Sequence, residues 1–210
     1  MKGLLLKDFL IIREGLLIMF FTMVAIGIGM VILVSPWVLT VIAGVSLSMT
    51  AVTTIQNDKT TQWDKFSATL PVSRAQIISS KYFMYLLLGL VGIALGILFS
   101  VVVSIWKQDF DGEQLLLYLS VAVMMSFLPG SISIPLSFIL DEEKGMVGLI
   151  LSYLVTSGLF AVIALFLNRV LHISLLDHLA TTCGIVAAIS AVVYIASWLF
   201  CSKKLCHKIF

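Results

Sequence analysis

Few side chains of the types that usually do chemistry are present, and their spacing does not indicate catalysis or metal binding. Cys201 and Cys206 bracket a short polar segment, where the alternatives to plain juxtamembrane thiols are a metal pair and a palmitoylation site. No other ligand cluster is near them in the sequence. His172 and His178 have a spacing that fits no standard metal site, so we interpret them as interfacial histidines.

Sequence motifs for nucleotide binding and for catalysis are also absent. No G-x-x-x-x-G-K-[ST] loop occurs, so we expect this chain not to cradle ATP phosphates itself. Glu142 and Glu143 would begin a paired-glutamate protease motif, but Val147 stands where that motif needs an arginine. We therefore predict that the chain is not an enzyme and binds no cofactor or metal. Its cations do not form the dense stripe of a nucleic-acid-binding protein, so we expect no nucleic acid partner.

The residues best spaced to bind another protein lie in the longest polar segment. Thr61 and Asp64 match a capping box, with Thr61 as N-cap and Asp64 at the third helical position. The short helix that would follow places Trp63, Phe66 and Leu70 on one face. Such an aromatic knob is either a docking device or a pair of side chains resting on the bilayer interface.

A second capping box comes directly afterwards. Ser73 and Gln76 have the required spacing, with Arg74 as the first residue inside the helix. The pattern predicts a helix that runs from Ser73 through Lys81 into the next apolar stretch.

The elements that hold these residues are predicted to be membrane helices. The 210 residues are 60% hydrophobic and 11% charged, whereas a soluble domain has about 25% charged residues. Stretches without Asp, Glu, Lys or Arg are long enough for helices of roughly 20 residues that cross a bilayer. We predict an all-α, polytopic membrane bundle, formed as one domain over 1–210, with six spans at about 16–34, 37–56, 83–106, 115–140, 146–167 and 179–201.

The distribution of cations predicts the orientation of these spans. Only Lys107 and Arg169 lie on one side, and this asymmetry makes the other side cytoplasmic. Both termini are then cytoplasmic, in a multi-pass protein of the cell membrane. The cytoplasmic cations are Lys2, Lys7, Arg13, Lys59, Lys65, Arg74, Lys81, Lys144, Lys203, Lys204 and Lys208.

Residues 2–14 are predicted to form a short amphipathic helix lying in the lipid headgroup plane, although a cytoplasmic extension of the first span is an alternative. Lys7 falls on its polar side, Phe9 and Ile12 on its apolar side, and Asp8 breaks the pattern.

Proline and glycine mark two further features of the spans. Pro129, Gly130 and Pro135 predict an irregular fourth span, which is either a hinge in a translocation path or a static kink. Gly92 and Gly96 have the spacing of close helix packing, which we assign to contacts within the chain.

Residues 67–82, Ser-Ala-Thr-Leu-Pro-Val-Ser-Arg-Ala-Gln-Ile-Ile-Ser-Ser-Lys-Tyr, resemble the "sLPvsR..iv.sKY" segment of small six-span type 2 ABC transporter permeases. The branch most similar includes the phenol-soluble modulin exporter permeases. The resemblance implies a cytoplasmic coupling helix between spans two and three that inserts into an ATP-binding cassette subunit, where ATP and Mg are held. It also implies a short re-entrant element at 168–179. The docking residues implied are Trp63, Asp64, Phe66, Leu70 and Arg74.

Two functions are the resulting hypotheses. The first is the permease of an ATP-driven exporter, working with membrane lipid around it and a second permease copy or paralogue beside it, as a homodimer or heterodimer. Its apolar spans suit amphipathic peptides, lipids or hydrophobic drugs, since no charge is predicted in the membrane interior. The alternative is a membrane-embedded immunity or binding protein without turnover.

Overall fold

The computed structural model of the protein is a bundle of helices. It describes residues 2–33, 35–67, 73–108, 111–140, 144–170 and 179–204, and no strand occurs within these ranges. The helices are α1 (Lys2–Leu33), α2 (Val38–Thr60), α3 (Trp63–Ser67), α4 (Arg74–Lys107), α5 (Gly112–Ile139), α6 (Gly145–Val170) and α7 (Leu179–Lys204). The all-α prediction is therefore confirmed for the described residues.

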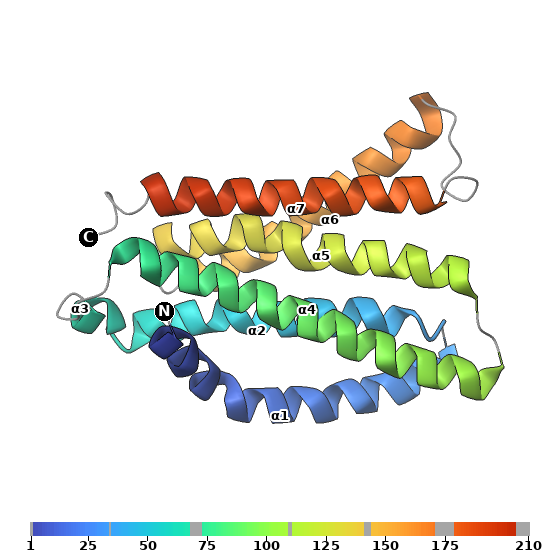
Figure 1. Ribbon diagram of the computed structural model, residues 1–210, viewed down its shortest axis with the longest axis horizontal. Helices are drawn as coiled ribbons and strands as arrows, with labels where there is room; N and C mark the ends of the chain where they lie inside the picture. Colours follow the sequence, from blue (N-terminus) through green and yellow to red (C-terminus); the bar gives the residue numbers. More distant parts are fainter. Residues whose placement is uncertain are drawn as a thin grey trace.

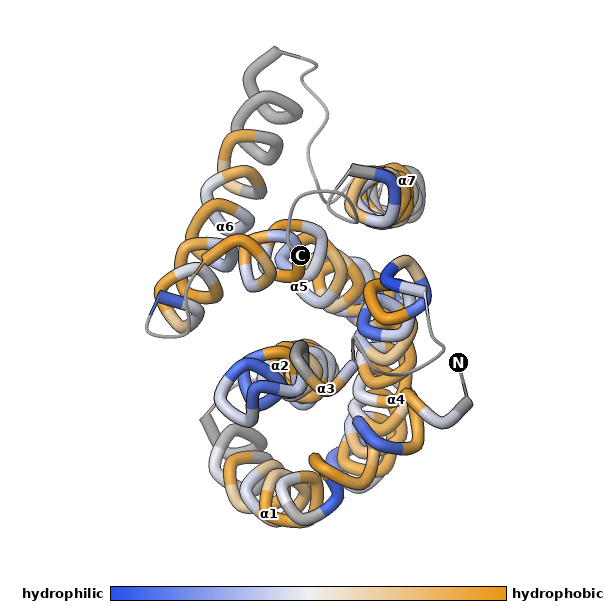
Figure 2. Tube along the Cα trace, turned by 90° about the vertical axis from the view of Figure 1, so that its left-hand side faces the viewer, coloured by the Kyte–Doolittle hydropathy of each residue, from blue (hydrophilic) through white to orange (hydrophobic). Residues whose placement is uncertain are grey.

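The long helices run alternately back and forth along the bundle, with α3 lying across one end (Figure 1). The start of α1 and the end of α7 lie at that same end. Seen from there, α1, α2 and α4 form one group and α6 and α7 lie on the opposite side of α5 (Figure 2). The main helix contacts agree with this plan, because α2 packs on α4, α1 and α5, while α5 packs on α6 and α7.

Four helices are long and apolar enough to cross a membrane: α2, α4, α5 and residues Gly184–Lys203 of α7. A fifth is added if the two arms of α1 count as one span. The apolar stretch described in α6, Gly145–Leu159, is shorter. The described residues thus support four to five membrane-capable helices, while the sixth span and the cytoplasmic position of the termini stay predictions.

Helix α1 bends by 52° between Gly3–Arg13 and Gly15–Ile26, so the predicted N-terminal segment exists as an arm of a longer helix (Figure 1). The side of the arm that packs on the bundle includes Asp8, the charged residue that breaks the amphipathic pattern. Asp8 and Ile12 are buried, at 1% and 4% exposure, whereas Phe9 is 45% exposed. The arm buries a carboxylate because cations of two helices, α1 and α4, lie against it.

Helices α2 and α4 approach closely at glycines. A Cβ at Gly92 would lie 2.6 Å from the carbonyl oxygen of Ala43, and one at Gly96 would lie 2.6 Å from Cα of Thr40. Any larger side chain would force the backbones apart, which is the reason small residues recur where membrane helices meet. The prediction that Gly92 and Gly96 serve packing within the chain is confirmed.

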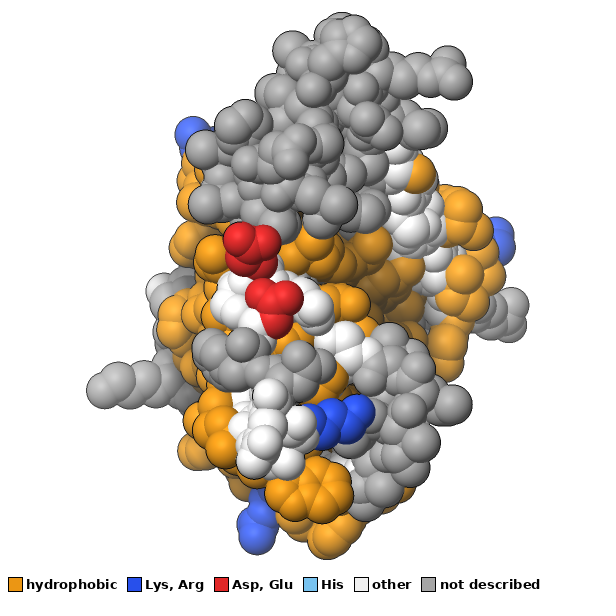
Figure 3. Space-filling model, turned by 90° about the vertical axis from the view of Figure 1, so that its right-hand side faces the viewer, with side chains coloured by type: hydrophobic (Ala, Val, Ile, Leu, Met, Phe, Trp, Pro, Cys, Tyr) orange, Lys and Arg blue, Asp and Glu red, His pale blue; other side chains and the backbone are white. Residues whose placement is uncertain are grey.

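The end of the bundle opposite α3 carries a group of acidic side chains beside hydrophobic ones (Figure 3). Asp111 caps the start of α5 there, its carboxylate accepting a hydrogen bond from the Glu113 backbone N–H at 3.0 Å. An acidic N-cap stabilises the positive end of the helix dipole.

Candidate functional site

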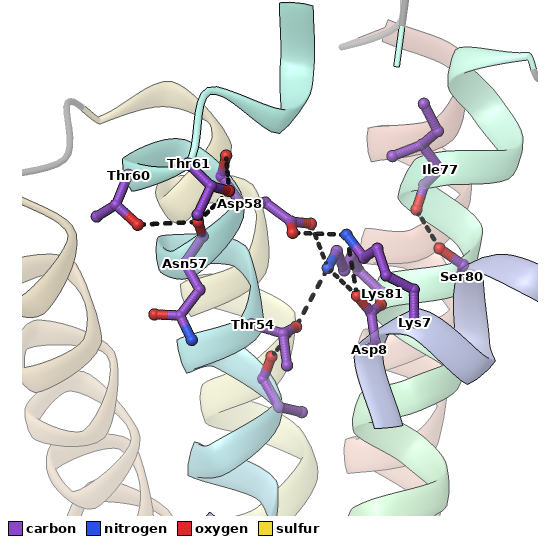
Figure 4. Close-up of polar contacts among 11 residues, drawn as sticks. Lys7, Asp8, Thr54, Asn57, Asp58, Thr60, Thr61, Ile77, Ser80 and Lys81 are labelled. Carbon is purple, nitrogen blue, oxygen red and sulfur yellow. Dashed lines mark hydrogen bonds and ion pairs between the residues drawn. The ribbon is translucent and has the colours of Figure 1, made fainter. Parts of the chain in front are cut away.

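The predicted docking segment forms a short helix, but its start differs from the prediction. Helix α3 begins at Trp63, after Gln62 takes a left-handed backbone conformation with φ 52°. Thr61 is not the residue directly before α3, which is Gln62, and its hydroxyl donates to the carbonyl of Asn57 at 2.8 Å at the end of α2 (Figure 4). Threonine offers this local alternative to capping the next helix.

The second capping box is confirmed in full. The Ser73 hydroxyl accepts from the Gln76 backbone N–H at 3.3 Å, and the Gln76 side chain accepts from the Ser73 N–H at 3.2 Å. Arg74 is the first residue of α4 and is exposed.

The two aromatic residues of α3 are not equally exposed. Phe66 is 56% exposed, whereas Trp63 is half-buried. Their ring centroids are 5.3 Å apart. Trp63 also contacts Lys7 of the α1 arm, whose Nζ lies 4.1 Å from the ring centroid, within cation–π range. Backbone alone is described for Asp64, and Leu70 lies outside the described residues.

Below α3 lies a cluster of four charged residues that the sequence did not predict as a unit: Lys7, Asp8, Asp58 and Lys81, here called the charged quartet (Figure 4). Lys81 Nζ lies 2.7 Å from Asp8 Oδ1 and 2.6 Å from Asp58 Oδ2. Lys7 Nζ lies 2.6 Å from Asp58 Oδ1 and 3.4 Å from Asp8 Oδ1. Two cations and two carboxylates leave the quartet formally neutral.

Three members of the quartet are almost wholly removed from solvent. Asp8, Lys81 and Asp58 are 1%, 4% and 6% exposed, and the Lys7 side chain is 22% exposed. Lys81 also donates to the Thr54 hydroxyl at 3.2 Å. Buried charges persist only where partners compensate the loss of water, so the quartet fixes the α1 arm, the end of α2 and the start of α4 relative to one another.

The sequence held weak signals for this cluster. Asp8 breaks the amphipathic pattern of the arm, as Leu6 and Leu10 also do, and Asp58 and Lys81 stand at the edges of two apolar stretches. Their approach depends on three helices meeting. A sequence pattern along a single helix cannot indicate that these three helices meet.

Pro129, Gly130 and Pro135 lie inside an uninterrupted α5, far along the chain from the quartet. Pro129 and Gly130 are buried, and a Cβ at Gly130 would lie 2.3 Å from the Tyr85 ring. The Tyr85 hydroxyl donates to the Ser126 carbonyl one turn earlier. Gly130 is thus packed against α4, and the role of the three residues as a hinge stays a prediction.

Pro135 has no N–H, so the carbonyl of Ser131 loses its helical donor. The Ser197 hydroxyl of α7 donates to that carbonyl at 2.6 Å. Tyr82 of α4 lies 2.9 Å from the same hydroxyl and, since the hydroxyl hydrogen of Ser197 is used, acts as the donor to it. The freed carbonyl therefore ties α5 to α7 and α4.

Among the described residues no group of His, Cys, Asp or Glu is placed to hold a metal ion. Cys201 is buried in the bundle core, while Cys206, His172, His178 and the pair Glu142–Glu143 lie outside the described residues. The predicted re-entrant element at 168–179 falls largely outside them too.

The short helix α3 thus carries one exposed aromatic side chain and lies against the buried charged quartet, at one end of an apolar helical bundle. No curated protein and no solved structure matches the chain. A family model described as "ABC-2 family transporter protein" matches residues 3–205, which is nearly the whole sequence. The chain therefore belongs to the ABC-2 family of transporter proteins, whose members are membrane permeases.

Proposed function

We propose that the chain is the transmembrane permease subunit of an ATP-driven exporter, and that a separate ATP-binding subunit docks on α3. The observation that carries this proposal is the family match over residues 3–205. The exposed Phe66 supports α3 as the docking element, because a half-exposed aromatic ring at a rigidly held helix can fill a pocket of a partner.

The substrate class proposed is amphipathic peptides, lipids or hydrophobic drugs. Within α4, no Asp, Glu, Lys or Arg occurs between Lys81 and Lys107, and α5 has none after Glu113. A path between such helices offers apolar contacts and hydroxyl groups rather than fixed charges, and proton- or ion-coupled carriers usually place an ionisable group there.

The experiment is gentle purification of the tagged protein from its native membrane, followed by mass spectrometry. We expect a stoichiometric P-loop ATPase in the preparation. Trp63→Ala with Phe66→Ala should remove it, and Phe66→Ala alone should weaken its retention, because Phe66 is exposed and its truncation leaves the interior intact. Matched controls are Trp106→Ala and Phe83→Ala, two exposed aromatics of α4.

Retention of the ATPase by the double variant would contradict α3 as the docking element. A preparation without any ATPase, repeated across mild detergents, would favour the immunity or binding function instead.

A further inference from the structure

The contacts beneath α3 form an unbroken series from the surface to the core. Phe66 contacts Trp63, with ring centroids 5.3 Å apart, and Trp63 contacts the ammonium of Lys7 at 4.1 Å. Lys7 in turn pairs with Asp58 at 2.6 Å. Exposure falls along this series, from 56% at Phe66 through the half-buried Trp63 to 22% at the Lys7 side chain and 6% at Asp58.

We propose that Lys7 is the positioning residue that links movement of α3 to the helical bundle. This inference rests on the proposed function, since it concerns the movement that docking at α3 would produce. Lys7 is the member of the quartet that touches both an aromatic ring of α3 and the buried carboxylates. The N-terminal arm thereby connects the docking helix to the bundle and is not only a membrane anchor.

The two lysines of the quartet have different roles in this proposal. Lys81 is buried and held by Asp8, Asp58 and the Thr54 hydroxyl, so it is the fixed anchor. Lys7 is partly exposed and is shared between a ring and two carboxylates, so a shift of Trp63 changes the position of its ammonium. Such a shift pulls on Asp58 at the end of α2 and on Asp8 of the arm together.

Helix α2 then carries the displacement along the bundle. Asp58 lies in its last turn, and Trp37 at its opposite end is 1% exposed. Because α2 packs on α1, α4 and α5, a movement of its end reaches most of the described bundle.

The four tryptophans of the chain provide a test that needs no knowledge of the substrate. The permease is labelled with fluorotryptophan, combined with its unlabelled ATP-binding subunit, and observed by ¹⁹F NMR before and after addition of Mg²⁺ and a non-hydrolysable ATP analogue. The resonances of Trp63 and Trp37 are assigned with Trp63→Phe and Trp37→Phe. In the wild type both resonances should shift on nucleotide addition.

Lys7→Met keeps the hydrocarbon stem and removes the charge. We expect it to retain the ATPase and the shift at Trp63 but to lose the shift at Trp37, whereas Lys7→Arg should restore the latter. Arg13→Met removes an exposed cation of the same arm and should leave both shifts unchanged. A Trp37 shift of wild-type size in Lys7→Met would overturn the role of Lys7.

Different results are expected if docking at α3, and not only the role of Lys7, is wrong. If nucleotide shifts neither resonance in the wild type although the ATPase is bound, α3 is not the coupling element and the role of Lys7 falls with it. If no ATPase binds, the proposed function itself is wrong.

Discussion

The ammonium of Lys81 contacts two carboxylates and a hydroxyl, and the residue is only 4% exposed. A buried ion pair contributes little net stability compared with apolar residues of the same size, but removing one partner leaves the other charge buried without compensation. We therefore expect a measurable loss of stability when the balance of two positive and two negative charges in the quartet is broken.

Lys81→Met should destabilise the protein by about 3–5 kcal/mol, because it leaves Asp8 and Asp58 buried with Lys7 as their one remaining quartet cation. Adding Asp8→Asn to Lys81→Met returns the cluster to neutrality and should recover part of the loss. The measurement is the midpoint of thermal unfolding in a mild detergent for both variants.

A control for this prediction is Lys203→Met, which removes an exposed cation at the same end of the bundle. It should leave the midpoint unchanged. Equal midpoints for Lys81→Met and the wild type would show that the ammonium is not needed to hold the three helices together.

The residues of the candidate site were predictable from the sequence to different degrees. Trp63 and Phe66 share one short helix, and a spacing of three residues is enough to bring them together. The contact of Trp63 with Lys7 joins residues 56 positions apart and depends on the bend of α1. Charges near the ends of apolar stretches are expected in any membrane protein, so the weak signals at Asp8, Asp58 and Lys81 did not indicate that these residues meet.

Among the elements, α5 shows how two prolines can lie in a continuous helix. Each proline removes a backbone donor, which in lipid must be replaced by another group. For Pro135 the replacement is the Ser197 hydroxyl of α7, which donates to the Ser131 carbonyl. The proline thus leads to a hydrogen bond between α7 and α5, in place of the backbone hydrogen bond that a regular helix would make within itself.

Ser197→Ala should cost about 1–3 kcal/mol, because it leaves the buried Ser131 carbonyl without its donor. In a Pro135→Ala background the restored N–H can take over, so the same change should cost less. Thermal unfolding of the two single variants and the double variant in detergent gives the coupling free energy. Additive effects would mean that the Ser197 bond does not compensate for the proline.

The two predicted capping boxes show which helix ends the local sequence predicts and which it does not. Ser73 and Gln76 satisfy one another within one turn, and the sequence predicted this correctly. Thr61 has the same spacing to an acidic residue, yet its hydroxyl closes α2, because that helix continues to Thr60 and presents the Asn57 carbonyl. The last turn of α2 carries Asp58 of the quartet, whose contacts with Lys7 and Lys81 the local pattern does not contain.

For the whole molecule, the alternating helices place the start of α1 and the end of α7 at the α3 end (Figure 1). The hydropathy pattern predicted the helices well, because apolar runs of this length have one stable structure in lipid. Helix α6 runs over Gly145–Val170, and its crossing, predicted over 146–167, stays a prediction. Crossing by α6 decides whether the chain has six spans or fewer.

Cysteine accessibility tests this topology in intact cells. In a background with Cys183, Cys201 and Cys206 replaced by alanine, Glu113→Cys and Arg169→Cys should react with a membrane-impermeant maleimide from outside. Thr60→Cys, at the α3 end, should react only after the membrane is made permeable, because the excess of cations on that side predicts that it is cytoplasmic.

The two external positions separate the possible errors. If Glu113→Cys is labelled but Arg169→Cys is protected until permeabilisation, α6 does not cross and the six-span prediction is wrong, while docking at α3 is unaffected. If Thr60→Cys is labelled in intact cells, α3 faces outward, where no ATP-binding subunit can reach it. That orientation would remove the role of Phe66 and of Lys7 together, because both depend on an energised partner at the α3 end.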